Sequence, residues 1–225
     1  MVQAAARPDT GDMVLIHRVF RREFRLLPAM VRAVPLGDLA RAKRVATHAV
    51  EYVGALHHHH AGEDDLLWPR LRARAAPNAD VVRRMEAQHA QVAALLARAD
   101  VLVPAWSADA EAAVRDELAD VLGQTSAVLD THLDEEERTV LPLAEQHLTV
   151  DEWAELGERG AASMPMRRGL VFLGHILEEA SPRERAAFLA RLPLPARLAY
   201  GIAGARMHRR EVADLRQGLP RQRSG

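Results

Sequence analysis

Residues 59–69, HHAGEDDLLWP, carry the pattern His-x3-Glu-x5-Pro, and residues 132–142, HLDEEERTVLP, carry the same pattern a second time. A lone histidine precedes each copy at nearly the same distance, His17 by 42 residues and His89 by 43. One His-x3-Glu pair is a weak signal, because four residues make about one helical turn and such pairs arise by chance. Two copies with matching upstream histidines predict one repeated polar arrangement.

Four amphipathic segments precede residue 148. Apolar residues with the helical period predict helices over about residues 12–34, 37–67, 78–100 and 107–141. We expect Pro69 and Pro142 to end the second and fourth helices, because the residue before a proline avoids the helical region. Ser107 is the expected cap of the fourth helix.

Six polar side chains fall on the apolar stripes of these helices, where an unpaired carboxylate costs several kcal/mol. They are His17, His59, Glu63, His89, His132 and Glu136. Residues i and i+4 lie one above the other on a helix, so each His-x3-Glu pair can address the same metal ions. If both glutamates bridge two ions, each ion receives two imidazole nitrogens and two carboxylate oxygens.

The chain contains no cysteine, which excludes disulfides, thiolate ligands and iron–sulfur clusters. A metal site must therefore use nitrogen and oxygen. Imidazoles and carboxylates with open positions suit iron better than magnesium or calcium, which prefer all-oxygen ligands. Zinc and manganese also fit, and iron is the metal we expect.

The composition is that of an ordinary globular protein of 225 residues, with 48% hydrophobic, 27% charged and only 4% aromatic residues. Alternating strand patterns bounded by Asn-Gly or Asp-Gly turns are missing, so the predicted fold class is all-α. A net charge of −1 and the lack of any run approaching ~20 apolar residues argue against nucleic-acid and membrane binding. With no stretch like a signal peptide, we expect a cytoplasmic protein.

We expect two parts, a metal-binding bundle over residues 1–147 and a helical extension over residues 148–225 that packs on it. Capping boxes at residues 149–152 and 181–184 predict helix starts in the extension, and its end is expected to fray from Pro220. The extension shows no convincing ligand spacing. Four other histidines are expected to be surface or ordinary interior residues: His48, His147, His175 and His208.

The order His, His-x3-Glu, His, His-x3-Glu on four successive helices resembles the hemerythrin-like, or HHE cation-binding, family over about residues 12–147. The resemblance implies an up-down four-helix bundle with two non-haem iron ions, oxo- or hydroxo-bridged, at its core. It implies that the four histidines are terminal ligands and that Glu63 and Glu136 are the bridges. Bacterial members bind or turn over oxygen, peroxide or nitric oxide, so catalase-like protection against oxidative or nitrosative stress is among the expected functions.

One position departs from the oxygen-carrying members, which have an extra histidine where this chain has Met85. One iron would then lack a ligand, unless His60, Glu86 or another neighbour supplies it. His60 is the best spare, and whether His59 or His60 is the ligand stays open. Tyr52 is interpreted mainly as a core residue, with a role beside the metal as the alternative. A more open site favours peroxide reactivity or nitric oxide capture over reversible oxygen carriage.

Two other function classes use the same sequence features. An iron sensor or store predicts that folding or partner binding depends on iron. An interaction module with residues 148–225 as its working surface predicts normal behaviour after replacement of Glu63 and Glu136. The oligomeric state is not determined by these patterns.

Overall fold

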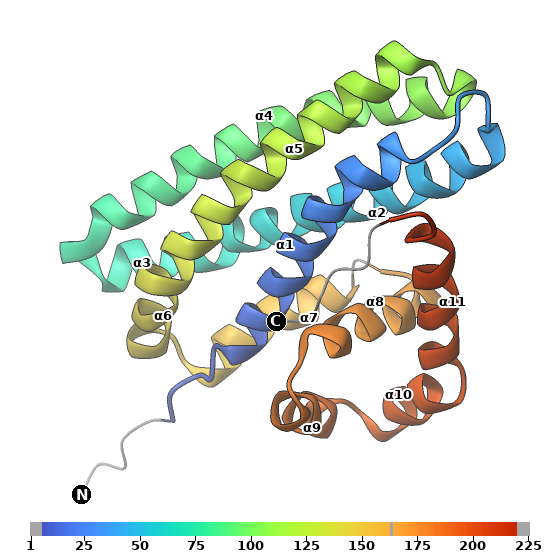
Figure 1. The fold of residues 1–225 in the computed structure, drawn as a ribbon. Coiled ribbons are helices and arrows are strands. Elements are labelled where there is room, and N and C mark those ends of the chain that lie inside the picture. Colours follow the sequence, from blue (N-terminus) through green and yellow to red (C-terminus); the bar gives the residue numbers. More distant parts are fainter. Residues whose placement is uncertain (1–5, 163, 220–225) are drawn as a thin grey trace, which may run out of the picture.

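The computed structural model describes residues 6–162 and 164–219, and all regular secondary structure in these ranges is helical (Figure 1). Four long helices form the bundle: α1 (Gly11–Arg32), α2 (Leu39–Gly62), α4 (Ala79–Asp109) and α5 (Ala112–Glu135). Helices α2 and α5 each pack against both α1 and α4, so the four helices enclose one apolar core. The predicted all-α, up-down bundle is confirmed.

Helices α2 and α5 do not end at the prolines that we expected to end them. Each continues through one π-helical turn into a further α-helix: η1 (Glu63–Leu67) and α3 (Trp68–Arg74) after α2, and η3 (Glu136–Val140) and α6 (Leu141–His147) after α5. A proline inside an α-helix clashes with the carbonyl four residues before it and lacks an N–H. The π turn changes the pairing to i→i+5, and Pro69 and Pro142 then lie in the first turn of the next α-helix, where proline is tolerated.

Helix α4 is longer than the sequence predicted. It continues through Pro104, and Ser107, the expected cap of the next helix, lies inside it and donates to the Pro104 carbonyl at 3.0 Å. Val103 and Trp106 are both buried in the bundle core, and their burial outweighs the helical hydrogen bond that proline removes. The helix ends at Asp109, and the next residue, Ala110, has a φ of 52° in the left-handed region. A short 3-10 helix, η2 (Ala76–Asn78), precedes α4.

The C-terminal helices pack on one side of the bundle (Figure 1). They are α7 (Val150–Ala162), α8 (Met166–Glu179), α9 (Pro182–Arg191), α10 (Leu194–Ala199), the π-helical η4 (Tyr200–Gly204) and α11 (Ala205–Leu215). Both expected capping boxes form. Ile176 of α8 and Leu215 of α11 belong to the same buried apolar cluster as the bundle core. The expected fraying from Pro220 lies outside the described residues.

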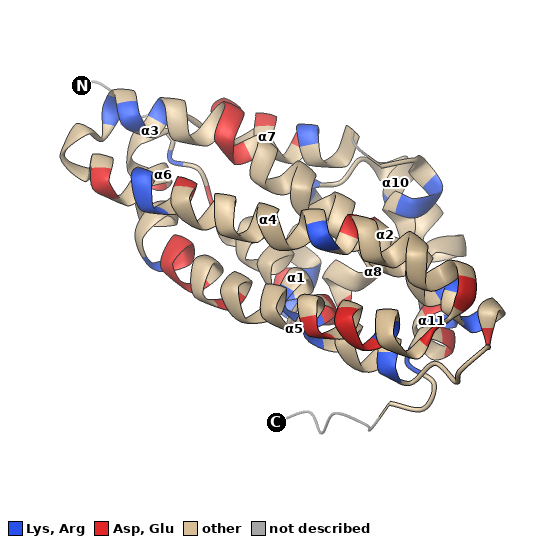
Figure 2. Ribbon diagram, turned by 90° about the horizontal axis from the view of Figure 1, so that it is seen from above, with Lys and Arg blue, Asp and Glu red and all other residues tan. Residues whose placement is uncertain are grey.

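Charged residues of both signs are distributed over the helices (Figure 2). Some of them join the two parts of the chain, as when Arg18 of α1 contacts Glu184 of α9 at 3.0 Å. Exposed pairs of this kind contribute little each, so the shared apolar core provides most of the attachment. None of the helices in the described ranges is long and apolar enough to cross a membrane.

Gly174 of α8 gives a test of how the extension packs. A Cβ atom at this position would lie 2.4 Å from Cγ of His208 in α11. We expect Gly174→Ala to lower the free energy of unfolding by about 1–3 kcal/mol, the usual cost of overpacking, in urea denaturation.

The matched control is Gly169→Ala on the same helix, where nothing lies within 4 Å of an added Cβ. It should raise the free energy of unfolding by roughly 0.5–1 kcal/mol, because alanine favours helix over glycine. Equal effects of the two substitutions would contradict the close contact between α8 and α11.

Candidate metal centre

Seven histidine and glutamate side chains meet in the interior of the bundle. They are His17 of α1, His59 and His60 of α2, Glu63 of η1, His89 of α4, His132 of α5 and Glu136 of η3. His59 has the most exposed side chain of the seven, at 10%, and both glutamates are fully buried. The structure therefore brings together all six residues of the repeated pattern, and His60 with them.

The seven residues form two groups that share Glu63. In each group, the ligand-type atoms lie within 4.8 Å of one another. One group contains His60, Glu63, His89 and His132, and the other contains His17, His59, Glu63 and Glu136. His59 and His60 thus both point inward, each to a different group. The His60 ring stacks on the His89 ring with centroids 4.0 Å apart, so the group that lacks a histidine at Met85 still has three imidazoles.

Each glutamate lies between an imidazole of one group and an imidazole of the other. Glu63 Oε1 is 3.1 Å from Nε2 of His59, and its Oε2 is 3.3 Å from Nε2 of His89. Glu136 uses a single oxygen, because its Oε2 is 3.5 Å from Nε2 of the α1 histidine and 3.7 Å from Nε2 of the α5 histidine. Glu63 therefore has the arrangement of a bridging carboxylate, with one oxygen toward each group.

Nine polar atoms of this cluster are buried without a hydrogen-bond partner: Nε2 of all five histidines and both carboxyl oxygens of Glu63 and Glu136. Orphaned polar atoms are rare in folded proteins, because each costs about 1–3 kcal/mol when buried. Imidazole nitrogens and carboxylate oxygens together are ligands for iron, zinc and manganese. The residues present therefore fit a pair of transition-metal ions.

In three of the inward-facing imidazoles, Nδ1 donates a hydrogen bond that fixes the ring from behind. The acceptors are Glu137 Oε1 for His17 (3.0 Å), Asp64 Oδ1 for His89 (2.8 Å) and Gln88 Oε1 for His132 (3.0 Å). A histidine that donates from Nδ1 has its lone pair on Nε2, so these contacts select the tautomer that can bind a metal.

The acceptors are themselves held in place. Trp68 Nε1 donates to Asp64 at 2.8 Å, and Arg21 Nη1 donates to Glu137 at 2.6 Å. The amide of Gln88 donates to Glu135 at 2.8 Å, which turns its carbonyl oxygen toward the histidine.

Asp64 and Glu137 each directly follow a central glutamate, and each binds a histidine of another helix. The repeat therefore extends one residue beyond the pattern that we used, as Glu-Asp in the first copy and Glu-Glu in the second. An acid after each His-x3-Glu pair was the signal that would have found both residues. Gln88 gave no such signal, because its role depends on the packing of α4 beside α5.

The structure does not bring Glu86 or Tyr52 to this cluster. The Glu86 carboxylate pairs with Arg72, and its side chain is 38% exposed, because it lies on the outer face of α4. Tyr52 is buried, but its ring packs on His48 and His175, with centroid distances of 4.7 and 5.7 Å. Tyr52 faces the C-terminal helices, so neither residue supplies the missing ligand.

Burial favours the uncharged form of five members of the cluster: His59, His60, Glu63, His132 and Glu136. Burial, followed by charge on the neighbouring imidazoles, lowers the pKa of His59 and His60 far below its usual range and that of His132 to about 3. Burial also raises the pKa of Glu63 strongly and, together with the adjacent Glu63 carboxylate, that of Glu136 to about 8. Metal binding must therefore release protons from the carboxyl groups.

This ionisation predicts how the stability of chelator-treated protein depends on pH. From about pH 7.5 to 8, Glu136 remains largely protonated in the folded chain and is ionised in the unfolded chain. The folded state then binds more protons, so the free energy of unfolding should fall as the pH rises. The cluster histidines with lowered pKa are neutral in the folded chain and largely neutral in the unfolded chain, so they do not reverse this trend.

Urea denaturation at several pH values measures how steeply the free energy of unfolding falls with pH. Glu136→Gln is the control. His175 contributes to both slopes, because Glu211 and Glu23 raise its pKa despite its burial. The difference between the slopes of wild type and Glu136→Gln therefore gives the contribution of Glu136 alone. Equal slopes for the two proteins would contradict its raised pKa.

A family model described as the hemerythrin HHE cation binding domain matches residues 10–144. These residues include all seven clustered side chains and end before α7. Searches of curated proteins and of solved structures give no significant match.

Proposed function

Since this chain belongs to the hemerythrin HHE cation-binding family, we propose that it is a non-haem di-iron protein that binds or turns over a small oxidant. The observation that carries the proposal is the set of nine buried, unpartnered nitrogen and oxygen atoms that face one another in the bundle. A cation-binding family and an inward-facing set of imidazoles and carboxylates point to the same chemistry. Iron is the metal whose preferences best match that set with positions left open.

The two groups would hold one ion each. His60, His89, His132 and one oxygen of Glu63 form the first set; His17, His59, Glu136 and the other oxygen of Glu63 form the second. His60 would take the place of the histidine that oxygen-carrying relatives have at Met85. The Nδ1 contacts hold three of the five rings in the tautomer that offers Nε2.

The burial of the centre supports a small ligand. Phe20 lies beside His59 and Trp68 lies beside His89, with ring centroids 5.2 and 5.5 Å apart, and both apolar rings are 2% exposed or less. Oxygen, hydrogen peroxide and nitric oxide are small enough to reach such a site through thermal motion of the side chains, whereas larger substrates are not. The irons, when bound, would exchange electrons with these molecules. Catalase-like turnover of peroxide, which protects against oxidative stress, is one reaction of this kind.

An iron sensor is the second candidate, and one contact favours it. The π turn η1, which carries Glu63, packs against α7 of the extension, and Arg159 of α7 pairs with Asp65 of η1. Iron held by Glu63 would therefore affect the segment on which the extension rests. A sensor role predicts that removal of iron loosens α7, which hydrogen exchange can measure.

Replacement of the central glutamates tests the metal centre. We expect Glu63→Ala and Glu136→Ala each to lose at least one iron per chain and the oxygen evolved on adding hydrogen peroxide, while the circular dichroism spectrum stays helical. Iron analysis and an oxygen electrode measure these effects. Glu155→Ala, at an exposed position of α7, is the control. Two irons per chain in both glutamate variants would overturn the assignment of Glu63 and Glu136 as metal ligands. If the wild-type protein holds two irons but does not turn over peroxide, oxygen binding, nitric oxide binding or iron sensing is favoured instead.

Adjacent aspartates in η1 test the contacts behind the ligands. Asp64→Ala removes the acceptor of His89 Nδ1, and we expect iron affinity to fall about 10–100-fold, the usual effect of losing such a partner. Asp65→Ala removes only an exposed pair with Arg159 and should leave the affinity unchanged. Competition with a chelator gives both values, and equal affinities would show that Asp64 does not position the histidine.

A further inference from the structure

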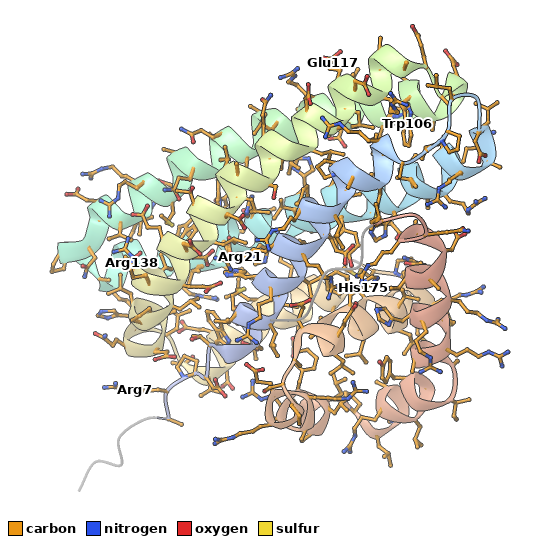
Figure 3. All side chains as sticks on the ribbon, viewed as in Figure 1. Arg7, Arg21, Trp106, Glu117, Arg138 and His175 are labelled. Carbon is orange, nitrogen blue, oxygen red and sulfur yellow. The ribbon has the colours of Figure 1, made fainter. Side chains whose placement is uncertain are left out.

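A second cluster of buried histidines and glutamates lies where the bundle meets the C-terminal helices, and we call this boundary the seam. His48 of α2, His175 of α8 and Glu23 of α1 are each 2% exposed or less. Figure 3 shows His175 between the bundle and the C-terminal helices. Sequence spacing assigned these histidines no role, because the residues around them come from helices that are far apart in the chain.

His48 is held like the histidines of the metal centre. Its Nε2 contacts Glu23 Oε2 at 2.9 Å, and its Nδ1 is buried without a partner. A carboxylate on one ring nitrogen and an unpartnered second nitrogen is the usual arrangement of a histidine that binds a metal. One ring nitrogen of His48 and one oxygen each of Glu51 and Glu211 lie within 4.8 Å of one another.

His175 lies beside this group but is not one of its ligands. Its buried Nε2 lies 3.8 Å from Oε1 of Glu211. Its Nδ1 is 3.0 Å from Arg22 Nη2, and a guanidinium can only donate, so Nδ1 accepts this hydrogen bond. Nε2 then carries the proton and has no lone pair to offer an ion.

We propose that His48, Glu51 and Glu211 form a second metal site, separate from the di-iron centre, for one divalent transition ion such as zinc or manganese. One imidazole and two carboxylates, with a further position for solvent, are a ligand set that both ions accept. The site is independent of the proposed function, since it shares no residue with the centre.

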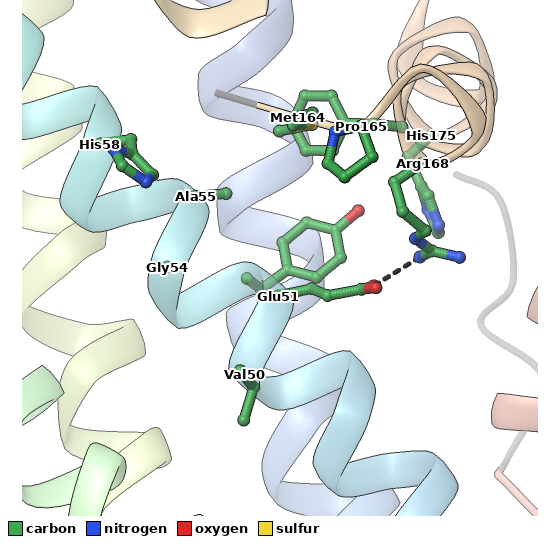
Figure 4. Close-up of a pocket in the computed structure, with 11 residues that line it drawn as sticks. Val50, Glu51, Gly54, Ala55, His58, Met164, Pro165, Arg168 and His175 are labelled. Carbon is green, nitrogen blue, oxygen red and sulfur yellow. Dashed lines mark hydrogen bonds and ion pairs between the residues drawn. The ribbon is translucent and has the colours of Figure 1, made fainter. Parts of the chain in front are cut away.

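Arg168 places a positive charge beside Glu51 and Glu211 in this structure. It donates to both oxygens of Glu211, at 2.6 and 3.0 Å, and also to Glu51 (Figure 4). Its side chain is 34% exposed, so it can turn outward when an ion binds. A cavity of about 290 Å³ is lined by Glu51, Tyr52, Arg168 and His175 among others, and it gives an ion access to the cluster. Arg168 is therefore the competitor of the ion.

An ion at the seam would join the two parts of the chain. His48 and Glu51 belong to α2 of the bundle, whereas Glu211 belongs to α11 of the C-terminal helices. Because the complete ligand set exists only when these helices are docked, binding would stabilise the docked form. Metal binding at the seam is thus coupled to attachment of the extension.

The test adds zinc to the full-length, iron-loaded protein and counts zinc and iron per chain after gel filtration, with affinities from chelator competition. We expect one zinc per chain in wild type without loss of iron, and at least tenfold weaker zinc binding in Glu211→Gln and His48→Gln. Glu117→Gln, at an exposed position that pairs with Arg98, should bind zinc like wild type. Glu63→Gln should lose iron and keep the zinc, which separates this site from the centre.

Arg168→Gln gives the decisive comparison, because the substitution at this partly exposed position leaves the buried histidines intact. A metal site predicts that zinc binds more tightly once the competing guanidinium is removed. A cluster that consists only of ion pairs predicts lower thermal stability and no gain in zinc affinity. That second result, or a wild-type chain that binds no zinc, would overturn the proposal.

Discussion

Two carboxyl groups buried among five imidazoles are the constraint on which the rest of this structure depends. No positive side chain belongs to the cluster, and its inward atoms have no hydrogen-bond partners. Burying these polar groups without partners costs free energy unless cations bind to them, so we interpret the arrangement as a set of metal ligands. All four bundle helices contribute at least one member, so the positions of the helices follow from the need to bring these atoms together.

The π turns connect this constraint to the course of the chain. Each begins at one of the two central glutamates, and each is followed by an α-helix with proline in its first turn. The same turns carry Asp64 and Glu137, which hold histidines of other helices from behind. One local irregularity, which occurs twice, thus places a metal-facing carboxylate and the support of a distant ligand in consecutive positions, with a proline six residues after the carboxylate.

The cost of burying polar groups is offset differently at the seam and at the metal centre. At the seam, Arg22, Arg168 and Arg216 lie beside the carboxylates and supply positive charge from within the chain. The centre contains no such residue and depends on ions from outside. This contrast explains why an ion at the seam has to compete with a guanidinium, whereas ions at the centre displace only protons.

The sequence alone determined the fold class and six of the seven clustered residues, because both follow from spacing within single helices. The 3.6-residue period sets the apolar stripe, and His-x3-Glu places two side chains on it one turn apart. Features that depend on a second helix were not accessible in this way. They include the inward position of His60, the support that Gln88 gives to His132, and the length of α4, which is set by the burial of Trp106. The proposed site at the seam was not predictable for the same reason, since its ligands lie on α2 and α11 and only tertiary packing brings them within reach of one ion.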